Sequence, residues 1–318
     1  MSDNMEHIMN ICVVLVTYNR IDLLKEALNC YNKQTFLPKY IIVVDNGSID
    51  GTKEYLEEWF HEKASFEKII LYTGSNLGGA GGFSVGIKRA LITDADFIFL
   101  ADDDAFAEPK ALEYLDKFYS SYSDKDSIGA ITTSVINCGE YAKGHRRVIR
   151  KGLFSIKEES VSAKLYNEDY FEIDQLSFVG AMIKKTVIQE IGTPIAEYFF
   201  QYDDIEYSER IRIKGYTIIC VPQSRMHHNT GIDNIKFSWK NYYAARNRLN
   251  YAKKYFCKPN YLYYIIVYYI KNCSMIARVL KKRTDAEIRM FKIAAKDAKI
   301  DNLGLNSIYK PGVDIEKL

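Results

Sequence analysis

The chain has 318 residues, of which 47% are hydrophobic, 26% are charged and only 6 are proline, a composition typical of a folded protein with a sizeable core. This composition excludes a disordered or fibrous chain. The first residues, MSDNMEHIMN, lack the basic and apolar regions of a signal peptide, so we expect a cytoplasmic protein. The six cysteines show no CxxC or Cys/His spacing, and they predict neither a zinc site nor a disulfide framework.

The net charge of +2 conceals two regions of opposite sign. Residues 231–318 contain 18 lysines and arginines against 7 aspartates and glutamates, so the rest of the chain is net acidic. A basic segment joined to an acidic body predicts a polyanionic partner, either anionic lipid or nucleic acid. We therefore expect two regions, residues 1–230 and a basic, tyrosine-rich region at residues 231–318.

The first 110 residues alternate between strand-like and helix-like patterns. A short β-branched apolar run predicts a buried strand at residues 11–18, and further strands are expected at residues 40–48, 68–74 and 96–104. Apolar residues at helical spacing predict helices at residues 22–34, 52–63 and 84–91. This alternation indicates an α/β fold with a mostly parallel central sheet and flanking helices.

The rest of the chain is less regular. Residues 137–172 are mixed in charge and predict a mobile excursion, after which residues 176–192 predict a strand and a helix that stops at Gly192. A second helix is expected through Lys214, stopped by Gly215, before a strand at residues 216–222. Helices are expected in the basic region at residues 237–256, 259–283 and 285–304.

Four polar clusters follow the first predicted strands: TYNR (17–20), DNGSIDGT (45–52), SNLGGAGGF (75–83) and DDD (102–104). Ligands of parallel sheets bind at the carboxyl ends of the strands. Because four polar loops converge on that edge, the sequence predicts a ligand site there.

The three aspartates suggest a metal site. Asp102 and Asp104 have the i, i+2 spacing that directs two carboxylates at one hard cation such as Mg²⁺ or Mn²⁺, which in turn bridges phosphates. Asp103 then points away, toward a sugar or ribose hydroxyl. An acidic surface loop is the alternative, but an apolar strand leading straight into the triplet favours the metal. His227 or His228, after a later strand, can complete the coordination.

Two further motifs each leave two interpretations open. Gly79, Gly81 and Ser84 do not match the dinucleotide fingerprint, so the glycine-rich segment predicts either close approach to a ligand or a flexible turn. Asp203 and Asp204 stand at the start of a predicted helix, where a carboxylate can act as a general base or as a helix cap.

The basic region predicts a contact surface. Residues 259–270 are uncharged, but they are too few to cross a bilayer. Their tyrosines and the basic residues that follow suit an interfacial helix on anionic lipid. Packing against the main domain or against a second subunit of a homo-oligomer is the alternative. The region shows no aromatic–glycine RNA-binding signature, so no nucleic-acid partner is expected.

Together these segments resemble the inverting GT-A glycosyltransferases of family two. The resemblance is carried by VVLVTYNR, IIVVDNGSIDGT, SNLGGAGGFSVGI, FIFLADDD, FVGAMIKK, YFFQYDDIEYSERIRIKGY, HH and WKNYYAARNRL, in that order over roughly residues 10–250. The DDD triplet with GGAGGF, and the aromatic-rich helix ending in RNRL, resemble the bacterial galactofuranosyltransferases most, with rhamnosyltransferases close behind. The resemblance implies a Rossmann-like GT-A domain, a nucleotide-diphospho sugar donor and a single in-line displacement with inversion.

The resemblance also implies roles for individual residues. Asp204 is implied as the catalytic base, and Asp45 as the acceptor of a hydrogen bond from uracil. The residues implied to bind the nucleotide sugar are Thr17, Tyr18, Arg20, Asp45, Asn76, Gly78, Gly79, Gly82, Asp102 and Asp103. The implied metal ligands are Asp102, Asp104 and His227 or His228, and spacing back from Trp239 favours His227. The residues implied on the acceptor side are Asp203, Glu206 and Trp239.

These features imply a Mn²⁺- or Mg²⁺-dependent transferase that moves galactofuranose from UDP-galactofuranose onto a lipid-linked cell-surface glycan at the inner face of a bacterial membrane. Transfer of rhamnose from dTDP-rhamnose is the nearest alternative. A nucleotidyltransferase or a non-catalytic binding module are alternatives of another class. Tyr202 and Met226 stand where galactofuranosyltransferases carry tryptophan, and the extra N-terminal β domain of polymerising members is missing. We therefore expect transfer of one or a few sugars.

Overall fold

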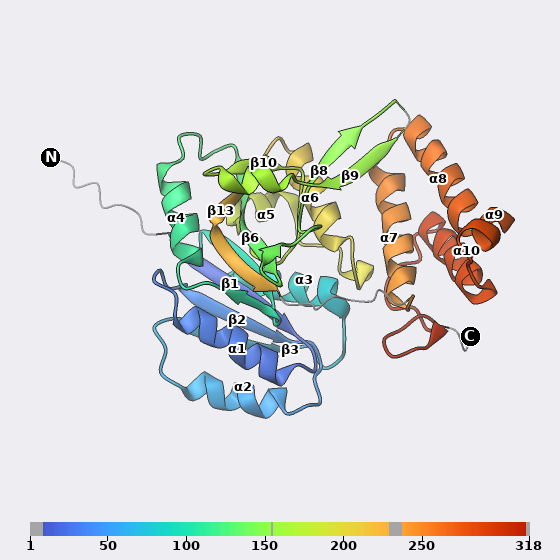
Figure 1. The fold of residues 1–318 in the computed structure, drawn as a ribbon. Helices are drawn as coiled ribbons and strands as arrows, with labels where there is room; N and C mark the ends of the chain where they lie inside the picture. The colour runs from blue at the N-terminus through green and yellow to red at the C-terminus, as the bar shows by residue number, and fades with distance from the viewer. Residues whose placement is uncertain (1–8, 154, 229–236, 316–318) are drawn as a thin grey trace.

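The computed structural model describes residues 9–153, 155–228 and 237–315. A central sheet carries helices on both faces, and a group of C-terminal helices lies beside it (Figure 1). The strand order of the sheet is β10-β13-β6-β12-β4-β1-β2-β3. The predicted α/β fold class is confirmed.

The parallel half of the sheet forms where the sequence predicts it. Its strands are β1 (Ile11–Thr17), β2 (Tyr40–Asp45), β3 (Glu67–Tyr72) and β4 (Phe97–Asp102). β1 pairs in parallel with β2 and β4, and it is buried along its whole length. Val13 lies in the core on one face of the sheet and Val14 in the core on the other, so the strand is a continuous apolar run.

Helices cover both faces of this half. The helices that contribute to the core around Val13 are α1 (Ile21–Asn32), α2 (Thr52–His61) and α4 (Ala111–Ser121). The helices that contribute to the core around Val14 are α3 (Gly78–Ala90), α5 (Lys185–Ile191) and α6 (Asp203–Ile213).

Helix α3 begins at Gly78, not at Ser84 as the sequence predicts, and the flexible-turn interpretation of its glycines is wrong. A Cβ added to Gly82 would come within 2.5 Å of Val16 Cγ1, and one added to Gly86 within 2.3 Å of Val14 Cγ1. The glycines are therefore needed because α3 packs directly on β1.

The other half of the sheet is mixed. β12 (Ala181–Lys184) runs antiparallel to both β4 and β6 (Ile128–Asn137), and β6 runs parallel to β13 (Thr217–His228). Three short strands complete it, namely β5 (Ala105–Ala107) on β13, β7 (Glu140–Tyr141) on β6, and β10 (Phe171–Ile173) on β13.

The mobile excursion predicted over residues 137–172 is wrong for the residues that the structure describes. β8 (Arg146–Lys151), β9 (Ile156–Ser160) and β11 (Gln175–Leu176) form a second, three-stranded sheet. Short 3₁₀ helices lie at Ala163–Asn167 (η1) and Ala196–Tyr198 (η2). The side chains of β9 are exposed or half-buried, so its mixed charge reflects contact with water and not a lack of structure.

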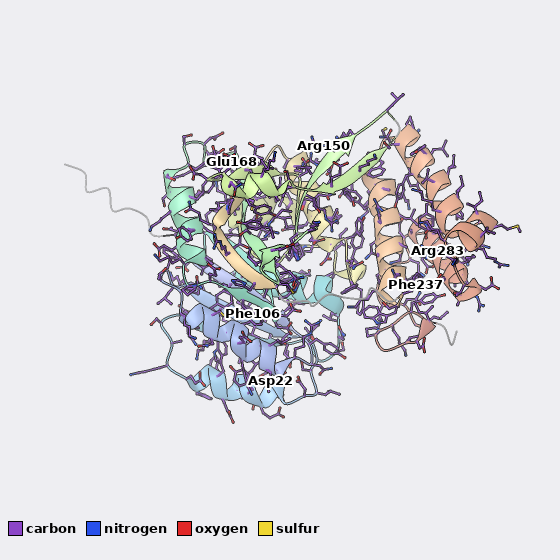
Figure 2. The ribbon with its side chains drawn as sticks, viewed as in Figure 1. Asp22, Phe106, Arg150, Glu168, Phe237 and Arg283 are labelled. Atoms are coloured by element: carbon purple, nitrogen blue, oxygen red, sulfur yellow. The ribbon has the colours of Figure 1, made fainter. Side chains whose placement is uncertain are left out.

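The basic region forms α7 (Lys240–Tyr255), α8 (Lys258–Asn272), α9 (Met275–Leu280) and α10 (Asp285–Lys299) around a third core. The helix predicted over residues 259–283 is interrupted, because the Ser274 side chain caps a new helix. Figure 2 labels Phe237 and Arg283 in this region, where the Arg283 guanidinium lies 5.7 Å from the Phe237 ring centroid. The predicted boundary between residues 230 and 231 lies outside the described residues. In the described ranges, no helix combines the length and apolar character needed to cross a bilayer.

Candidate active site

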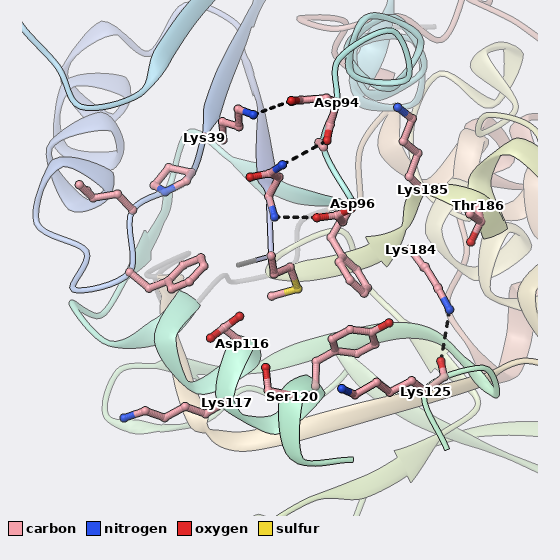
Figure 3. Close-up of a pocket in the computed structure, with 18 of the residues that line it drawn as sticks. Lys39, Asp94, Asp96, Asp116, Lys117, Ser120, Lys125, Lys184, Lys185 and Thr186 are labelled. Atoms are coloured by element: carbon pink, nitrogen blue, oxygen red, sulfur yellow. Dashed lines mark hydrogen bonds and ion pairs between the residues drawn. The ribbon is translucent and has the colours of Figure 1, made fainter. Parts of the chain in front are cut away.

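A cavity of about 1580 Å³ lies at the amino ends of the parallel strands (Figure 3). Its lining includes Asn10, Lys39 and Asp96, and the Lys39 Nζ lies 2.5 Å from Asp94 Oδ2. None of the residues that the sequence singles out for chemistry lines this cavity. Those residues lie at the opposite edge of the sheet, where ligands of parallel sheets bind.

The carboxyl ends of the parallel strands bring the four polar clusters together. Thr17 at the end of β1 is paired with Asp45 at the end of β2, and Asp102 ends the neighbouring β4. The glycine-rich cluster joins them through Asn46, whose side-chain amide donates to the carbonyl oxygen of Gly78 at 3.0 Å. The edge predicted from the sequence is thus one continuous site.

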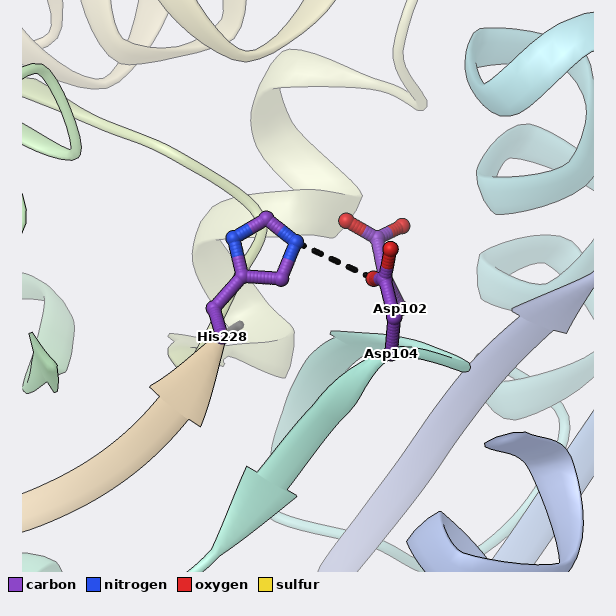
Figure 4. Close-up of side chains that lie close together, drawn as sticks. All are labelled: Asp102, Asp104 and His228. Atoms are coloured by element: carbon purple, nitrogen blue, oxygen red, sulfur yellow. Dashed lines mark hydrogen bonds and ion pairs between the residues drawn. The ribbon is translucent and has the colours of Figure 1, made fainter. Parts of the chain in front are cut away.

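Asp102, Asp104 and His228 form a cluster that can hold a metal ion (Figure 4). Each offers one ligand atom, and the three atoms lie within 4.8 Å of one another. His228 Nε2 lies 3.0 Å from Asp104 Oδ1, and His228 Nδ1 is buried with no hydrogen-bond partner among the described residues. Two carboxylates beside the imidazole nitrogen Nε2 are a ligand set that fits a divalent cation such as Mn²⁺.

Strand pairing decides which histidine faces the aspartates. The end of β13 pairs with β5, which directly follows Asp104. Because successive side chains of a strand point to opposite faces, only one of the two histidines can turn toward Asp104. His227 points the other way, and its Nε2 lies 3.0 Å from Glu108 Oε1. Of the two histidines left open by the sequence, His228 is therefore the one that lies beside Asp102 and Asp104.

Arg20 connects the ends of β1 and β4. Its guanidinium donates to Asp104 Oδ2 at 2.6 Å and to Asp103 Oδ1 at 3.1 Å. The other oxygen of Asp103 accepts from the Thr17 hydroxyl at 2.8 Å, and the Asp103 side chain is buried. Since both oxygens of Asp103 are engaged within the chain, the sugar contact predicted for it has no support from the geometry.

Burial of these charges changes how readily they ionise. Burial and the neighbouring Asp104 raise the pKa of Asp102 to about 7, and burial raises the pKa of Asp103 to about 6 despite Arg20. Burial also opposes ionisation of Asp104 and His228, yet their mutual hydrogen bond lowers the pKa of Asp104 and raises that of His228. The cluster therefore retains protons that a bound cation would displace.

The remaining donor-side residues surround the same edge. Asp45 is buried, and its Oδ1 accepts from the backbone N–H of Ser48 at 2.9 Å. Tyr18 follows β1 and is 38% exposed. Asn76 Oδ1 accepts from the backbone N–H of Gly78 at 2.8 Å, which fixes the start of α3.

The glycines of α3 differ in what surrounds them. Gly78 has φ +74°, and a Cβ there would lie 2.0 Å from the carbonyl oxygen of Phe199. A Cβ on Gly79 would meet no atom of the described residues within 4 Å. Gly78 and Gly82 are thus required by packing, whereas Gly79 leaves open space at the site edge.

The second acidic cluster opens helix α6. Tyr202, with φ +68°, is the N-cap residue and makes no side-chain cap hydrogen bond, so neither Asp203 nor Asp204 occupies the N-cap position. Asp204 Oδ1 accepts from the backbone N–H of Ile205 at 2.7 Å. Burial raises the pKa of both aspartates, helped at Asp203 by the charge of Asp204 and opposed at Asp204 by Arg147.

The other two residues implied on the acceptor side are engaged elsewhere. Glu206 is buried, and its carboxylate accepts from Arg210 Nε at 3.0 Å and from the Tyr255 hydroxyl at 2.6 Å. The Trp239 ring centroid lies 5.3 Å from that of Phe200. Both side chains serve packing within the protein, so an acceptor contact has no support at either position.

Sequence reasoning missed two arginines next to this cluster. Arg146 is fully buried and donates to the carbonyl oxygens of Thr133 at 2.9 Å and Val179 at 2.8 Å. Arg147 is the charge that opposes the raised pKa of Asp204. In the sequence the two arginines are visible only as an adjacent basic pair inside the segment expected to be mobile. The sheet formed by β8, β9 and β11 brings this pair to the site.

The loop before α6 is strained and is held by Asn247. Phe199, Gln201 and Tyr202 have positive φ values of 63°, 63° and 68°. Such conformations cost about 1–3 kcal/mol per residue and persist only where the surroundings impose them. Asn247 is fully buried in α7. Its side-chain N–H groups donate to the carbonyl oxygens of Tyr198 (2.9 Å), Phe200 (2.9 Å) and Gln201 (2.8 Å).

Arg246 holds Asn247 in turn. Its Nε donates to Asn247 Oδ1 at 2.9 Å, and its Nη groups donate to the carbonyl oxygens of Gly304 at 2.7 Å and Tyr198 at 3.1 Å. Helix α7 therefore fixes the backbone that carries Asp203 and Asp204.

Solved structures share this fold. The chain superposes on GalNAc-T7 with UDP, GalNAc and Mn²⁺ at a TM-score of 0.64 and 15% identity, covering 93% of this chain and 57% of that one. It superposes on residues 1–349 of S. aureus TarS in complex with UDP at a TM-score of 0.57 and 16% identity, covering 95% and 85%. At these identities the likeness shows the fold alone. Fold and site together define the class, the GT-A glycosyltransferases.

The chain belongs to glycosyl transferase family 2, whose profile matches residues 12–192. It is 28% identical over 228 residues to galactofuranosyltransferase GlfT1 of Mycobacterium tuberculosis, covering 71% of this chain and 72% of that protein. It is 29% identical over 238 residues to GlfT1 of Mycolicibacterium smegmatis, covering 73% and 75%. It is also 26% identical over 266 residues to the dTDP-rhamnosyl transferase RfbF of Shigella flexneri, covering 77% and 80%.

We expect Asn247→Asp to lower the free energy of unfolding by about 2–4 kcal/mol, because it places a carboxylate oxygen against buried carbonyl oxygens that now receive hydrogen bonds. Urea denaturation measures this. Asn29→Asp, the same change on the exposed face of α1, is the control and is expected to shift stability by less than about 0.5 kcal/mol. Equal stability of the two variants would show that Asn247 does not hold the loop.

Proposed function

We propose that this family 2 enzyme is a metal-dependent inverting transferase that moves galactofuranose from UDP-galactofuranose to a hydroxyl group of a lipid-linked glycan. The observation that carries the proposal is the cluster of Asp102, Asp104 and His228 at the carboxyl edge of the sheet. The similarity of the chain to galactofuranosyltransferases, over about three quarters of their length, supports the choice of sugar.

Transfer of rhamnose from dTDP-rhamnose is the second candidate. It is supported by the similarity to RfbF, which covers a larger share of both chains at slightly lower identity. The two candidates share the fold, the metal ligands and the base, and they differ only in the donor. Family membership favours glycosyl transfer over the nucleotidyltransferase and binding-module alternatives.

On the donor side, Asp102, Asp104 and His228 would hold Mn²⁺ or Mg²⁺, which when bound supplies positive charge to a diphosphate leaving group. Arg20 orients Asp104 by the 2.6 Å hydrogen bond between them. Asp45 would receive a hydrogen bond from the nucleotide base. Thr17, Tyr18, Asn76 and the glycines at the start of α3 would form the rest of the nucleotide-sugar pocket.

On the acceptor side, Asp204 would remove the proton from the attacking hydroxyl. The hydroxyl oxygen forms a bond to the anomeric carbon as the bond from that carbon to the diphosphate oxygen breaks, so the configuration inverts. Burial raises the pKa of Asp204, which makes it a stronger base, and the side chain is half-buried whereas Asp203 is only 8% exposed. Asp204 is therefore the better placed of the two.

We expect His228→Ala to weaken Mn²⁺ binding about tenfold or more, and His227→Ala to leave it unchanged. Because a cation binds the ionised carboxylate and the pKa of Asp102 is about 7, affinity of the unaltered protein should rise as the pH increases through 7. Isothermal titration with MnCl₂ in the presence of UDP, at several pH values, measures both effects. Equal losses in the two variants would contradict the assignment of His228.

We expect the full-length protein with Mn²⁺ to turn over UDP-galactofuranose and not UDP-galactopyranose or dTDP-rhamnose, with release of nucleoside diphosphate as the measurement. Asp204→Asn should reduce transfer about 10²- to 10⁴-fold while UDP and Mn²⁺ still bind. Preference for dTDP-rhamnose would change the donor and keep the mechanism. No metal-dependent response to any of the three donors would overturn the proposal.

The exposed face of α8 and α9 would contact the membrane that holds the acceptor lipid. Its exposed apolar side chains include Leu262, Ile266, Met275 and Val279, with fractional exposures between 50% and 80%. The basic residues that would meet anionic headgroups are Arg278 in α9 and Lys281 and Lys282 directly after it.

We expect the protein to sediment with phosphatidylglycerol vesicles, less so with phosphatidylcholine vesicles, and less as salt increases. Val279→Glu should weaken this binding, whereas Ile92→Glu should not. Ile92 is the matched control because its exposure of 74% is close to the 71% of Val279, and it lies just after α3. Binding that is equal for the two variants, or equal for the two lipids, would contradict a membrane contact.

A further inference from the structure

A groove of about 410 Å³ lies between β9 and helix α8, at the top of the C-terminal helices in Figure 1. Lys157, Glu158 and Glu159 of β9 form one wall. The opposite wall is formed by α8 residues at helical spacing, among them Tyr263, Tyr264, Val267 and Lys271. Neither the donor pocket nor the exposed face of α8 and α9 accounts for this groove.

The β9 wall of the groove is connected, through Glu158, to the loop that precedes α6. Glu158 has a side chain only 8% exposed, and its Oε2 accepts from the Tyr202 hydroxyl at 3.0 Å. Arg248 lies 3.7 Å from the same oxygen, and its guanidinium is 5.3 Å from the ring centroid of Tyr264. Tyr202 stands two residues before Asp204, so the Tyr202–Glu158 hydrogen bond links the wall of the groove to the loop that carries the proposed base.

The chemistry of the walls suits a carbohydrate. Tyr263 is 46% exposed and, with Tyr264, offers flat ring faces on which the C–H side of a sugar can rest. Glu158, Arg248 and Lys271 provide the acceptors and donors that hydroxyl groups need. Groups of both charge signs face the groove together, which favours a neutral polyhydroxyl ligand over a phosphate.

The geometry points to this groove as the binding site for the sugar units of the acceptor that precede the reacting hydroxyl. The inference rests on the proposed function, since it assigns the acceptor of that same reaction. In this assignment the β8–β9 hairpin and α8 together bind the glycan. Tyr202 connects the groove to Asp204 through its hydrogen bond to Glu158.

The test compares Tyr263→Ala with Tyr269→Ala in the full-length protein. Both tyrosines lie on α8 and are about equally exposed, at 46% and 45%, but Tyr269 does not line the groove. The probes are neutral di- and trisaccharide octyl glycosides that end in galactofuranose, rhamnose or N-acetylglucosamine, with binding followed by saturation-transfer NMR. Where a probe is also glycosylated, its KM is measured, together with hydrolysis of the donor by water.

We expect Tyr263→Ala to weaken binding of the recognised glycoside, or raise its KM, about five- to tenfold, while Tyr269→Ala matches the unaltered protein. Donor hydrolysis, UDP binding and Mn²⁺ binding should be the same in all three proteins. In hydrolysis water takes the place of the acceptor, and neither UDP nor Mn²⁺ binds in the groove. Failure of donor hydrolysis and UDP binding in every protein would count against the proposed function, whereas selective loss of glycoside binding would still support the groove.

Three outcomes would overturn the groove assignment. The first is equal glycoside binding by Tyr263→Ala and Tyr269→Ala. The second is no binding of any glycoside to the unaltered protein. The third is competition for the groove by inorganic pyrophosphate but not by the glycosides, which would show an anion site.

Discussion

The structure depends on keeping several carboxylates close together at the end of one sheet. Asp102, Asp103 and Asp104 follow β4, and Asp203 and Asp204 open α6 so near to them that the charge of Asp102 raises the pKa of Asp203. In a partly buried setting such charges repel strongly, and a folded chain must offset this or keep protons bound. The protein uses Arg20, Thr17 and His228 for part of the offset. The negative charge that these contacts leave unbalanced suits the binding of a divalent cation and the acceptance of a proton.

The same constraint explains why the C-terminal helices are part of the site. A loop with three left-handed residues delivers Asp203 and Asp204, and it gains its stability from the buried amide of Asn247 in α7. The carbonyl oxygen of Phe199, in that loop, also accepts from the backbone N–H of Ala80 in α3 at 3.3 Å. One loop therefore joins α3, α6 and the C-terminal region. Changes in α7 should reach the chemistry through this loop without any contact to substrate.

The sequence predicted those features that depend on local pattern. Continuous β-branched runs gave β1 to β4, and the rule that parallel sheets bind ligands at their carboxyl ends placed Asp102 and Asp104 correctly at one edge. The features that it missed depend on contacts distant in sequence. The choice of His228 over His227 needs the register of β13 on β5, and the glycines of α3 needed the position of β1. Arg146 and Arg147 lie in β8, a short and mostly half-buried strand whose pattern RRVIRK cannot be distinguished from a loop without its partner strands.

If the proposed contacts hold, helix α8 serves two ligands with one amphipathic pattern. With 3.6 residues per turn, Tyr264, Val267 and Lys271 fall on one side of the helix with Tyr263 at its edge, and Leu262 and Ile266 fall on another side. The first stripe lines the groove beside β9, and the second is exposed to solvent. An ordinary surface helix has a single apolar stripe toward the core. The two stripes suit the two parts of the proposed acceptor, with tyrosines toward sugars and aliphatic side chains toward lipid. A lipid-linked glycan presents both surfaces at once, so a single helix would hold the acceptor by its lipid side and its sugar side together.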